Sequence, residues 1–401
     1  MSKITNGAAP SRNGAAPLKN GVVGAAPFKN GTAPLKTGVV GAAPLIKAIK
    51  NGDSKTALKL IDEGCETREI KKGKNTPLIW ACELMLDEVA LKLISNKKED
   101  VGYVNKHGTT ALTWACFNKM EKVALKLLET GNANPEQRDD IKKTALMYCT
   151  DDAENTMEKV ALRLIEVMKA NLGQPNRIGS TALMKACSKK NEKTALALIK
   201  TGEAKPEQVN KDGLTALMYA CDKNLPDVAM ALLKTGKARP EQVSKDGWTA
   251  LMYTCSLDNN KLDKVAFKLL ATGKARPEQI NKGGLTSLTW ATKTNKKNVA
   301  LALLKTRKAM PDIISKKNKN SALIHACKNK MTEVALKILE NCKAKPAHIQ
   351  KEGYTALYWV NKNHLPKRLK ERLEEMLVKC KGKKTQKSKK PYKNKKTRKQ
   401  K

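Results

Sequence analysis

A short motif recurs along the chain at nearly constant spacing, and this constrains the fold more than any other feature. Thr-Ala-Leu or a close variant is found nine times, at intervals of 34 or 35 residues except for two intervals of 37. A degenerate tenth copy begins at Ala43. Periods of roughly 20–50 residues are typical of stacked repeat proteins. The nine copies begin at Thr76, Thr110, Thr144, Thr181, Thr215, Thr249, Thr286, Ser321 and Thr355.

The unit that begins at Thr215 shows what each copy predicts. Thr215 is a suitable N-cap for a first helix that ends near Lys223. Pro226 stands just inside the start of a second helix, which ends near Thr235 and is followed by Gly236. One such unit cannot bury its apolar face alone, whereas ten stacked units can. The sequence therefore predicts an all-α solenoid of about ten helix–turn–helix units.

This pattern resembles the ankyrin repeat, whose signature is Thr-Pro-Leu-His-x-Ala. Thr76-Pro77-Leu78 keeps the family proline, but every unit replaces the family histidine. Thr-Ala-Leu-Met-Tyr-Ala-Cys, with Ala-x-Pro-Glu-Gln-Val-Asn-Lys-Asp-Gly, is similar to ankyrin proteins encoded by large DNA viruses that infect amoebae. The resemblance covers roughly 42–378 and implies an ankyrin-repeat solenoid that serves protein–protein interaction.

Charge divides the chain into three parts. The whole chain has 78 Lys and Arg against 38 Asp and Glu, a formal charge of +40. Residues 1–41 are rich in Gly, Ala and Pro and contain no acidic residue, and residues 379–401 contain thirteen basic residues and no acidic one. Such segments have little apolar surface to bury. We therefore expect a disordered N-terminal arm (1–41) and a disordered basic C-terminal tail (379–401) on either side of the solenoid (42–378).

Aromatic residues gather at one position of the repeat. By the ankyrin resemblance, this position lies on the face of the first helix that borders the concave surface. A ring there can pack on its counterpart in the next unit, or it can anchor a partner as Trp and Tyr often do. Both interpretations stay open. The predicted ridge is Trp80, Trp114, Tyr148, Tyr219, Tyr253 and Trp290, with Trp359 in the last unit and with Lys185 and His325 in place of a ring.

A second position, between the turn glycine and the threonine, varies freely from unit to unit. In ankyrin repeats such loop tips contact partners, and a varied, exposed position on a rigid scaffold suits a binding surface. We expect Trp248 and Tyr354 to be the strongest partner-binding residues here, with Leu214 and Leu285 at the same position.

Catalytic and metal-binding patterns are not recognisable. Six of the ten cysteines share one repeat position, which predicts a ladder of small buried side chains rather than converging metal ligands or disulfides. The four histidines show no His-Glu-x-x-His spacing. We expect no enzymatic activity, no metal and no cofactor. The cysteines are Cys82, Cys116, Cys187, Cys221, Cys255 and Cys327.

The end of the chain carries a basic cluster typical of nuclear-localisation signals and of polyanion-binding patches. Nuclear targeting, contact with nucleic acid and simple solubility all stay open for it. Its residues are Lys389, Lys390, Lys393, Lys395, Lys396, Arg398 and Lys399.

The sequence as a whole favours a non-catalytic scaffold or adaptor that binds a protein partner on its concave ankyrin surface. The alternative is a nonspecific nucleic-acid-associated protein. No run approaches 18 apolar residues, and no apolar signal core follows Met1. We therefore expect a monomer without membrane contact, located in the cytoplasm or nucleus (of a host cell, if the protein is viral).

Two units carry three extra residues between their helices, around Asp151–Glu154 and Asp258–Asn260. The first is expected to form a small acidic knob. For each insertion, tolerated loop drift and a docking feature are the two interpretations.

Overall fold

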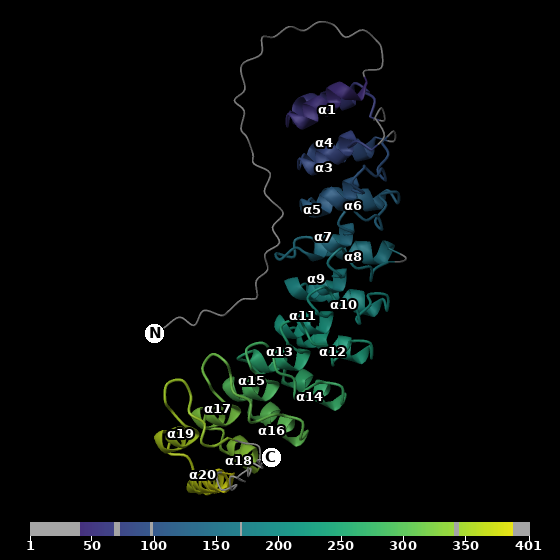
Figure 1. Ribbon diagram of the computed structural model, residues 1–401. Coiled ribbons are helices and arrows are strands. Elements are labelled where there is room, and N and C mark those ends of the chain that lie inside the picture. The colour runs from purple at the N-terminus through teal and green to yellow at the C-terminus, as the bar shows by residue number, and fades with distance from the viewer. Residues whose placement is uncertain (1–40, 68–72, 97–98, 169–170, 341–344, 388–401) are drawn as a thin grey trace, which may run out of the picture. The chain divides into compact units, whose positions relative to one another are not determined.

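The computed structural model describes residues 41–67, 73–96, 99–168, 171–340 and 345–387 (Figure 1). These residues form twenty α-helices and no strand. The arm predicted at 1–41, apart from Gly41, lies outside the described residues, as do residues 388–401 of the predicted tail.

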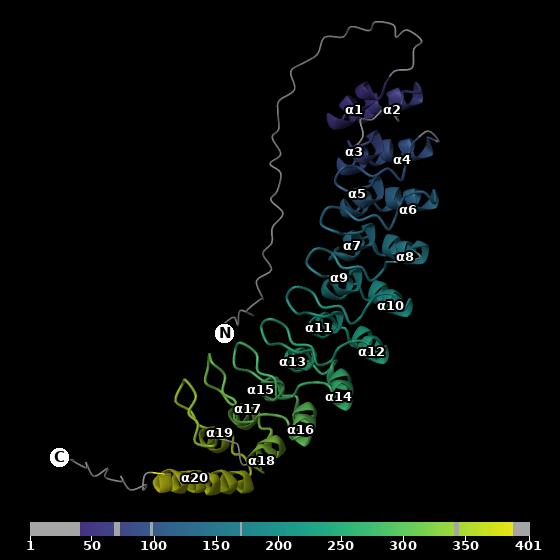
Figure 2. The ribbon, with the colours of Figure 1, turned by 45° about the vertical axis from the view of Figure 1, so that its right-hand side comes forward.

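The helices alternate between two layers. The first helices of the pairs are α1 (Ala42–Lys50), α3 (Pro77–Glu83), α5 (Ala111–Phe117), α7 (Ala145–Thr150), α9 (Ala182–Lys189), α11 (Ala216–Asp222), α13 (Ala250–Ser256), α15 (Ser287–Lys293), α17 (Ala322–Lys328) and α19 (Ala356–Lys362). The second helices are α2 (Ser54–Asp62), α4 (Asp87–Ser95), α6 (Glu121–Glu129), α8 (Glu158–Val167), α10 (Glu192–Lys200), α12 (Pro226–Lys234), α14 (Asp263–Ala271), α16 (Lys297–Lys305), α18 (Thr332–Glu340) and α20 (Lys367–Lys387). Each odd helix packs on the next odd helix, and each even helix packs on the next even one (Figure 2). The predicted all-helical solenoid of ten pairs is confirmed.

The repeat motif sets the helix boundaries as the sequence predicts. Thr215 Oγ1 accepts a hydrogen bond from the backbone N–H of Met218 at 3.3 Å, and the Thr or Ser that begins each of the other eight copies caps its helix in the same way. Pro226 opens α12, where its missing N–H removes no intrahelical bond. Gly236 follows with a φ of 69°, a left-handed conformation that glycine adopts without strain.

The core runs along the stack between the two layers. In each unit, apolar residues of the odd and even helices are almost fully buried, as Leu217 and Leu232 are. The six cysteines of the predicted ladder are buried within this core. Burial raises the pKa of Cys187, Cys255 and Cys327 to about 12, so these thiols stay protonated and poorly reactive at neutral pH.

The loops between units are organised by a buried polar residue that the sequence analysis did not recognise. Asn210 Oδ1 accepts hydrogen bonds from the backbone N–H groups of Asp212 and Leu214, both at 2.9 Å. Each loop is then joined to the preceding one by a backbone bond, such as Lys245 N–H to Asp212 O at 2.9 Å. Gly247 has a φ of 80°, and a Cβ there would come within 2.8 Å of Asn281 Cα. The loops therefore stack in register beside the odd helices (Figure 2).

The last helix differs from the prediction. The solenoid was expected to end at 378, but α20 continues to Lys387. Its sequence is rich in Lys, Arg, Glu and Leu, which are good helix formers, and Arg372 pairs with Glu375 at 2.6 Å. Leu369 and Leu373 are fully buried, whereas charged residues cover its outer side. This helix thus closes the apolar end of the stack, as terminal repeats of solenoids do.

Both insertions are fastened to the unit that follows them. Asn191 Nδ2 donates to the carbonyl oxygens of Thr150 and Asp152 at 3.3 and 3.2 Å. At the equivalent position, the buried Lys296 donates to Asn259 O and, at 2.7 Å, to Asp263 Oδ1. Buried carbonyl groups of an inserted loop need donors. The first unit has Asp53 at this position, and the remaining seven units have Leu or Met: Leu86, Met120, Met157, Leu225, Leu262, Met331 and Leu365.

Candidate partner-binding surface

The predicted aromatic ridge lies on the odd helices, which together with the loops form the inner side of the curved stack (Figure 2). All of its rings pack against the hydrophobic core of their own stack. Among the described residues, no ridge ring contacts the ridge ring of the next unit directly, so the choice between packing and partner binding stays open. Part of each ring stays at the surface. The half-buried rings are Trp80, Trp114, Tyr148, Tyr219, Tyr253, Trp290 and Trp359.

Phe117 extends the ridge, although the sequence analysis did not single it out. Its ring meets Trp114 edge-on with 5.6 Å between centroids, and it meets Tyr148 of the next unit edge-on at 5.4 Å. Its side chain is 55% exposed. A lone Phe at the last position of α5, where other units have polar residues, was the available signal.

Trp248 is not the exposed loop tip that the sequence predicted. The chain turns at Gly247, and the side chain of Trp248, which follows directly, lies against the ridge. The Trp248 ring stacks on Tyr253 at 4.7 Å and lies 5.5 Å from the ring of Trp290. Three rings from two units therefore form one continuous aromatic surface, and the stacking predicts that Trp248 also contributes to stability.

Tyr354, Leu214 and Leu285, the other predicted partner-binding residues of the variable loop position, also lie beside the odd helices. Tyr354 is 37% exposed and stacks on Tyr358 at 4.2 Å. Leu214 is half-buried against the core, and Leu285 is half-buried as well. The variable position and the ridge, which the sequence analysis treated separately, thus belong to one surface.

Lysines add positive charge to this surface. Lys50 Nζ lies 4.3 Å from the centroid of Trp80, Lys143 Nζ lies 4.5 Å from that of Tyr148, and Lys293 Nζ lies 4.4 Å from that of Trp290. A cation over an aromatic face is an attractive contact.

At the two ridge positions that lack Trp or Tyr, the charge of Lys185 is paired within the chain and His325 is uncharged at neutral pH. Lys185 pairs with Asp151 at 3.1 Å, and Asp151 also meets Lys143 at 3.2 Å and Lys189 at 3.7 Å. Burial alone would raise the pKa of Asp151, but these lysines outweigh it and the pKa is lowered. Burial lowers the pKa of His325 to about 4, so the imidazole is neutral at pH 7.

The first insertion is not the open acidic knob that the sequence predicted. Asp152 is 5% exposed, pairs with Lys119 at 2.8 Å and accepts hydrogen bonds from Thr156. Burial opposes ionisation, but these bonds lower the pKa of Asp152 to about 2. Lys119 also binds Glu154 at 2.9 Å. The insertion therefore neutralises lysines of its own chain.

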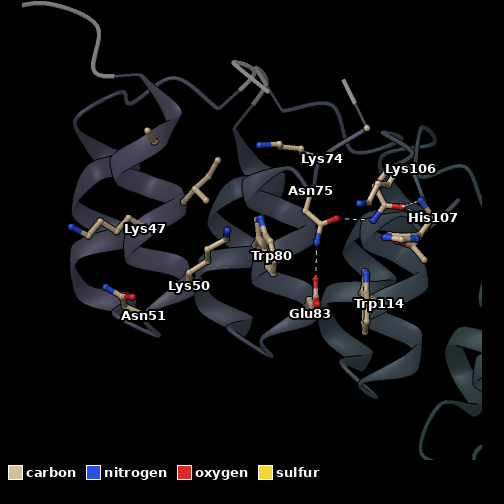
Figure 3. Close-up of a pocket in the computed structure, with 15 residues that line it drawn as sticks. Lys47, Lys50, Asn51, Lys74, Asn75, Trp80, Glu83, Lys106, His107 and Trp114 are labelled. Carbon is tan, nitrogen blue, oxygen red and sulfur yellow. Dashed lines mark hydrogen bonds between the residues drawn. The ribbon is translucent and has the colours of Figure 1, made fainter. Parts of the chain in front are cut away.

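A groove of about 1150 Å³ crosses α1, α3 and α5 (Figure 3). Trp80 and Trp114 line it together with four lysines. Glu83 is the acidic residue in its wall, where Asn75 Nδ2 donates to Glu83 Oε2 at 2.7 Å. Burial raises the pKa of this carboxyl group. The lysines are Lys47, Lys50, Lys74 and Lys106.

Within the described ranges, no three His, Cys, Asp or Glu side chains are placed to bind a metal ion. The helices of these ranges also include none with the length and apolar character needed to cross a membrane.

A family model described as ankyrin repeats (three copies) matches residues 45–139 and 146–242. Ankyrin repeats are therefore confirmed in this chain, from α1 to α12, and the last four pairs continue the same helix and loop geometry. Such repeats indicate a protein–protein interaction scaffold and are generally non-catalytic. A comparison with curated proteins found no match. The resemblance to viral ankyrin proteins stays a prediction.

Proposed function

We propose that this chain is a non-catalytic adaptor that binds a protein partner across the aromatic ridge and the loop residues stacked on it. The observation that carries the proposal is the continuous surface of Trp248, Tyr253 and Trp290. Partly exposed Trp and Tyr side chains on a rigid support are the residues that most often dominate binding energy.

The loops support the same interpretation. Because backbone hydrogen bonds join successive loops, little conformational freedom is left to lose when a partner binds. The even helices instead expose mainly charged side chains, such as Glu88, Lys122 and Lys234. A partner that needs apolar anchors finds them on the ridge side.

The first prediction tests this surface with paired variants. Trp248→Ala and Tyr354→Ala should each weaken partner binding by about 1–2 kcal/mol, because each removes a stacked ring at the surface. Phe267→Ala is the matched control, since Phe267 is an exposed ring on the even helix α14. The measurement is affinity capture of binding proteins by the full chain and by each variant, with and without nuclease.

Circular dichroism must first show that the variants keep their helix content. A partner captured equally well by the wild type and by both ridge variants would contradict the proposal, as would a partner lost only with Phe267→Ala. Capture that disappears with nuclease would favour the alternative, a nonspecific nucleic-acid-associated protein.

The basic cluster Lys389–Lys399 lies outside the described residues, so its role in nuclear targeting or polyanion contact stays a prediction. Action in the cytoplasm or nucleus, and the monomeric state, are part of the same proposal.

A further inference from the structure

We infer that the groove over α1, α3 and α5 binds an acidic, extended peptide segment. The inference rests on the proposed function, because it names the chemistry of one segment of the protein partner. It depends on the charges and hydrogen-bonding groups of the groove, whereas the proposed function depends on the rings near α13, α15 and α19.

Four lysines gather at the groove without an ion pair, whereas the lysines gathered around Asp151 are paired with it. Lys47, Lys50, Lys74 and Lys106 form no ion pair with any residue that the structure describes. The carboxyl group of Glu83 already accepts from Asn75 and is partly buried. The groove therefore presents a surplus of positive charge to a ligand and favours an anionic one.

Two contacts favour a peptide over a nucleic acid strand. The face of Trp80 is already covered by Lys50 Nζ at 4.3 Å, so a base would have to displace this lysine in order to stack. The charge of Glu83 repels phosphate and peptide carboxylates alike and does not separate the two ligands, whereas its hydrogen-bonding capacity does. Its Oε1 atom has no partner among the described residues and can accept a backbone N–H, which a peptide offers and a phosphodiester backbone does not.

The ends of this chain do not match the groove in charge. Residues 1–41 and 379–401 contain no Asp or Glu. The occupant is thus a segment of another protein. Packed helices lie about 8–10 Å apart, so the two steps from α1 to α5 cover about 20 Å, the reach of about six extended residues.

The experiment compares two triple variants of the full chain that remove the same charge. The groove variant is Lys47→Gln, Lys74→Gln and Lys106→Gln, which leaves Lys50 on Trp80. The control is Lys122→Gln, Lys234→Gln and Lys264→Gln on the even helices α6, α12 and α14. The probes are a fluorescent peptide of about eight residues that alternates Glu with Leu or Phe, and a fluorescent oligothymidine. Binding is followed by fluorescence anisotropy at about 0.15 M NaCl, where charges more than about 8 Å apart are largely screened.

The groove variant should bind the peptide about tenfold more weakly, since each surface ion pair contributes about 0.2–1 kcal/mol, and the control should change it less than about twofold. Both variants should lower oligothymidine binding equally. Equal loss of peptide binding in the two variants, no measurable peptide binding by the wild type, or a larger effect of the groove variant on oligothymidine would overturn the inference. A partner that needs Trp248 and Tyr354 but not the groove lysines would overturn it and leave the proposed function standing.

Discussion

The groove over α1, α3 and α5 and the cluster around Asp151 use lysine in opposite ways. In the cluster, Lys143, Lys185 and Lys189 surround one carboxylate. In the groove, four lysines line the wall, and the carboxylate beside them is held by an asparagine. Both regions lie on the odd-helix side of the same scaffold. In one place the lysines are paired within the chain, and in the other they have no ion pair among the described residues, which is where we propose that a partner segment binds.

The insertions explain part of this difference. The first insertion supplies Asp151, Asp152 and Glu154, and their pairs with lysines join neighbouring units. The second insertion is followed by Lys296, whose ammonium group is buried against Asp263. The units that form the groove have no insertion between their helices. Their carboxylate at the repeat position of Asp151 is Glu83, which accepts a hydrogen bond from Asn75 and forms no ion pair with a described lysine.

The largest effect on stability is expected for Lys296, a buried lysine whose ammonium group donates to two acceptors within the chain. Lys296→Met should lower the free energy of unfolding by about 2–4 kcal/mol, because it leaves the Asn259 carbonyl and the Asp263 carboxylate without their buried donor. Lys74→Met in the groove, where no ion pair is lost, should change it by less than about 0.5 kcal/mol. Urea unfolding followed by circular dichroism measures both. If the two substitutions lowered the free energy of unfolding equally, the claim that paired lysines stabilise the fold and groove lysines do not would be wrong.

His325 tests the other ridge position that lacks a large ring. Its pKa is lowered to about 4 by burial and by the neighbouring Lys293 and Lys328. Below pH 6.5 the unfolded chain binds a proton that the folded chain does not. Stability should therefore fall by about 1–3 kcal/mol as the pH drops from about 6.5 to about 4.

The matched variant is His325→Tyr, which restores the ring found in other units and removes the titrating group. The difference in unfolding free energy between wild type and variant, measured from pH 7 to pH 4, should follow this trend. A difference that does not change with pH would show that the imidazole is not kept neutral.

A smaller effect on stability than those of Lys296→Met and of the His325 titration is expected from opening the Asp151 cluster. Asp151→Asn should cost about 1 kcal/mol, because the ion pairs are partly exposed. It should also make the cluster resemble the groove and raise the affinity for the acidic peptide probe about threefold, since three lysines lose their carboxylate. Glu154→Gln is the control, because Glu154 is largely exposed and, among the residues that the structure describes, forms an ion pair with Lys119 alone. Unchanged peptide affinity in Asp151→Asn would contradict the electrostatic part of the comparison.

Periodicity explains how much the sequence could predict. The caps, the paired helices, the buried cysteines and the alignment of the rings repeat in nearly every unit, so each copy supports the others. Features of single units were missed or wrong. Trp248 was placed at an exposed tip because its stacking depends on Tyr253 and Trp290, whose side-chain directions a pattern does not give.

The charge pairs were missed although a signal existed. Residues one period apart lie side by side in a solenoid, and Asp151 with Lys185 is such a pair. Lys296 and Asn191 also stand out as polar residues at a position that is Leu or Met in the other units after the first. The groove lies beside α1, whose unit is degenerate in sequence, so the periodic pattern carried little information there.

One measurement tests most directly whether a partner binds on the ridge side. The photo-crosslinking residue p-benzoylphenylalanine replaces either Phe117, next to Trp114 and Tyr148, or Phe267 on α14. Both side chains are exposed aromatic rings, 55% and 39% respectively, so both positions accept the larger ring. We predict that irradiation of the bound complex crosslinks the partner from position 117 and not from position 267. Crosslinking from position 267 with none from position 117 would contradict the account.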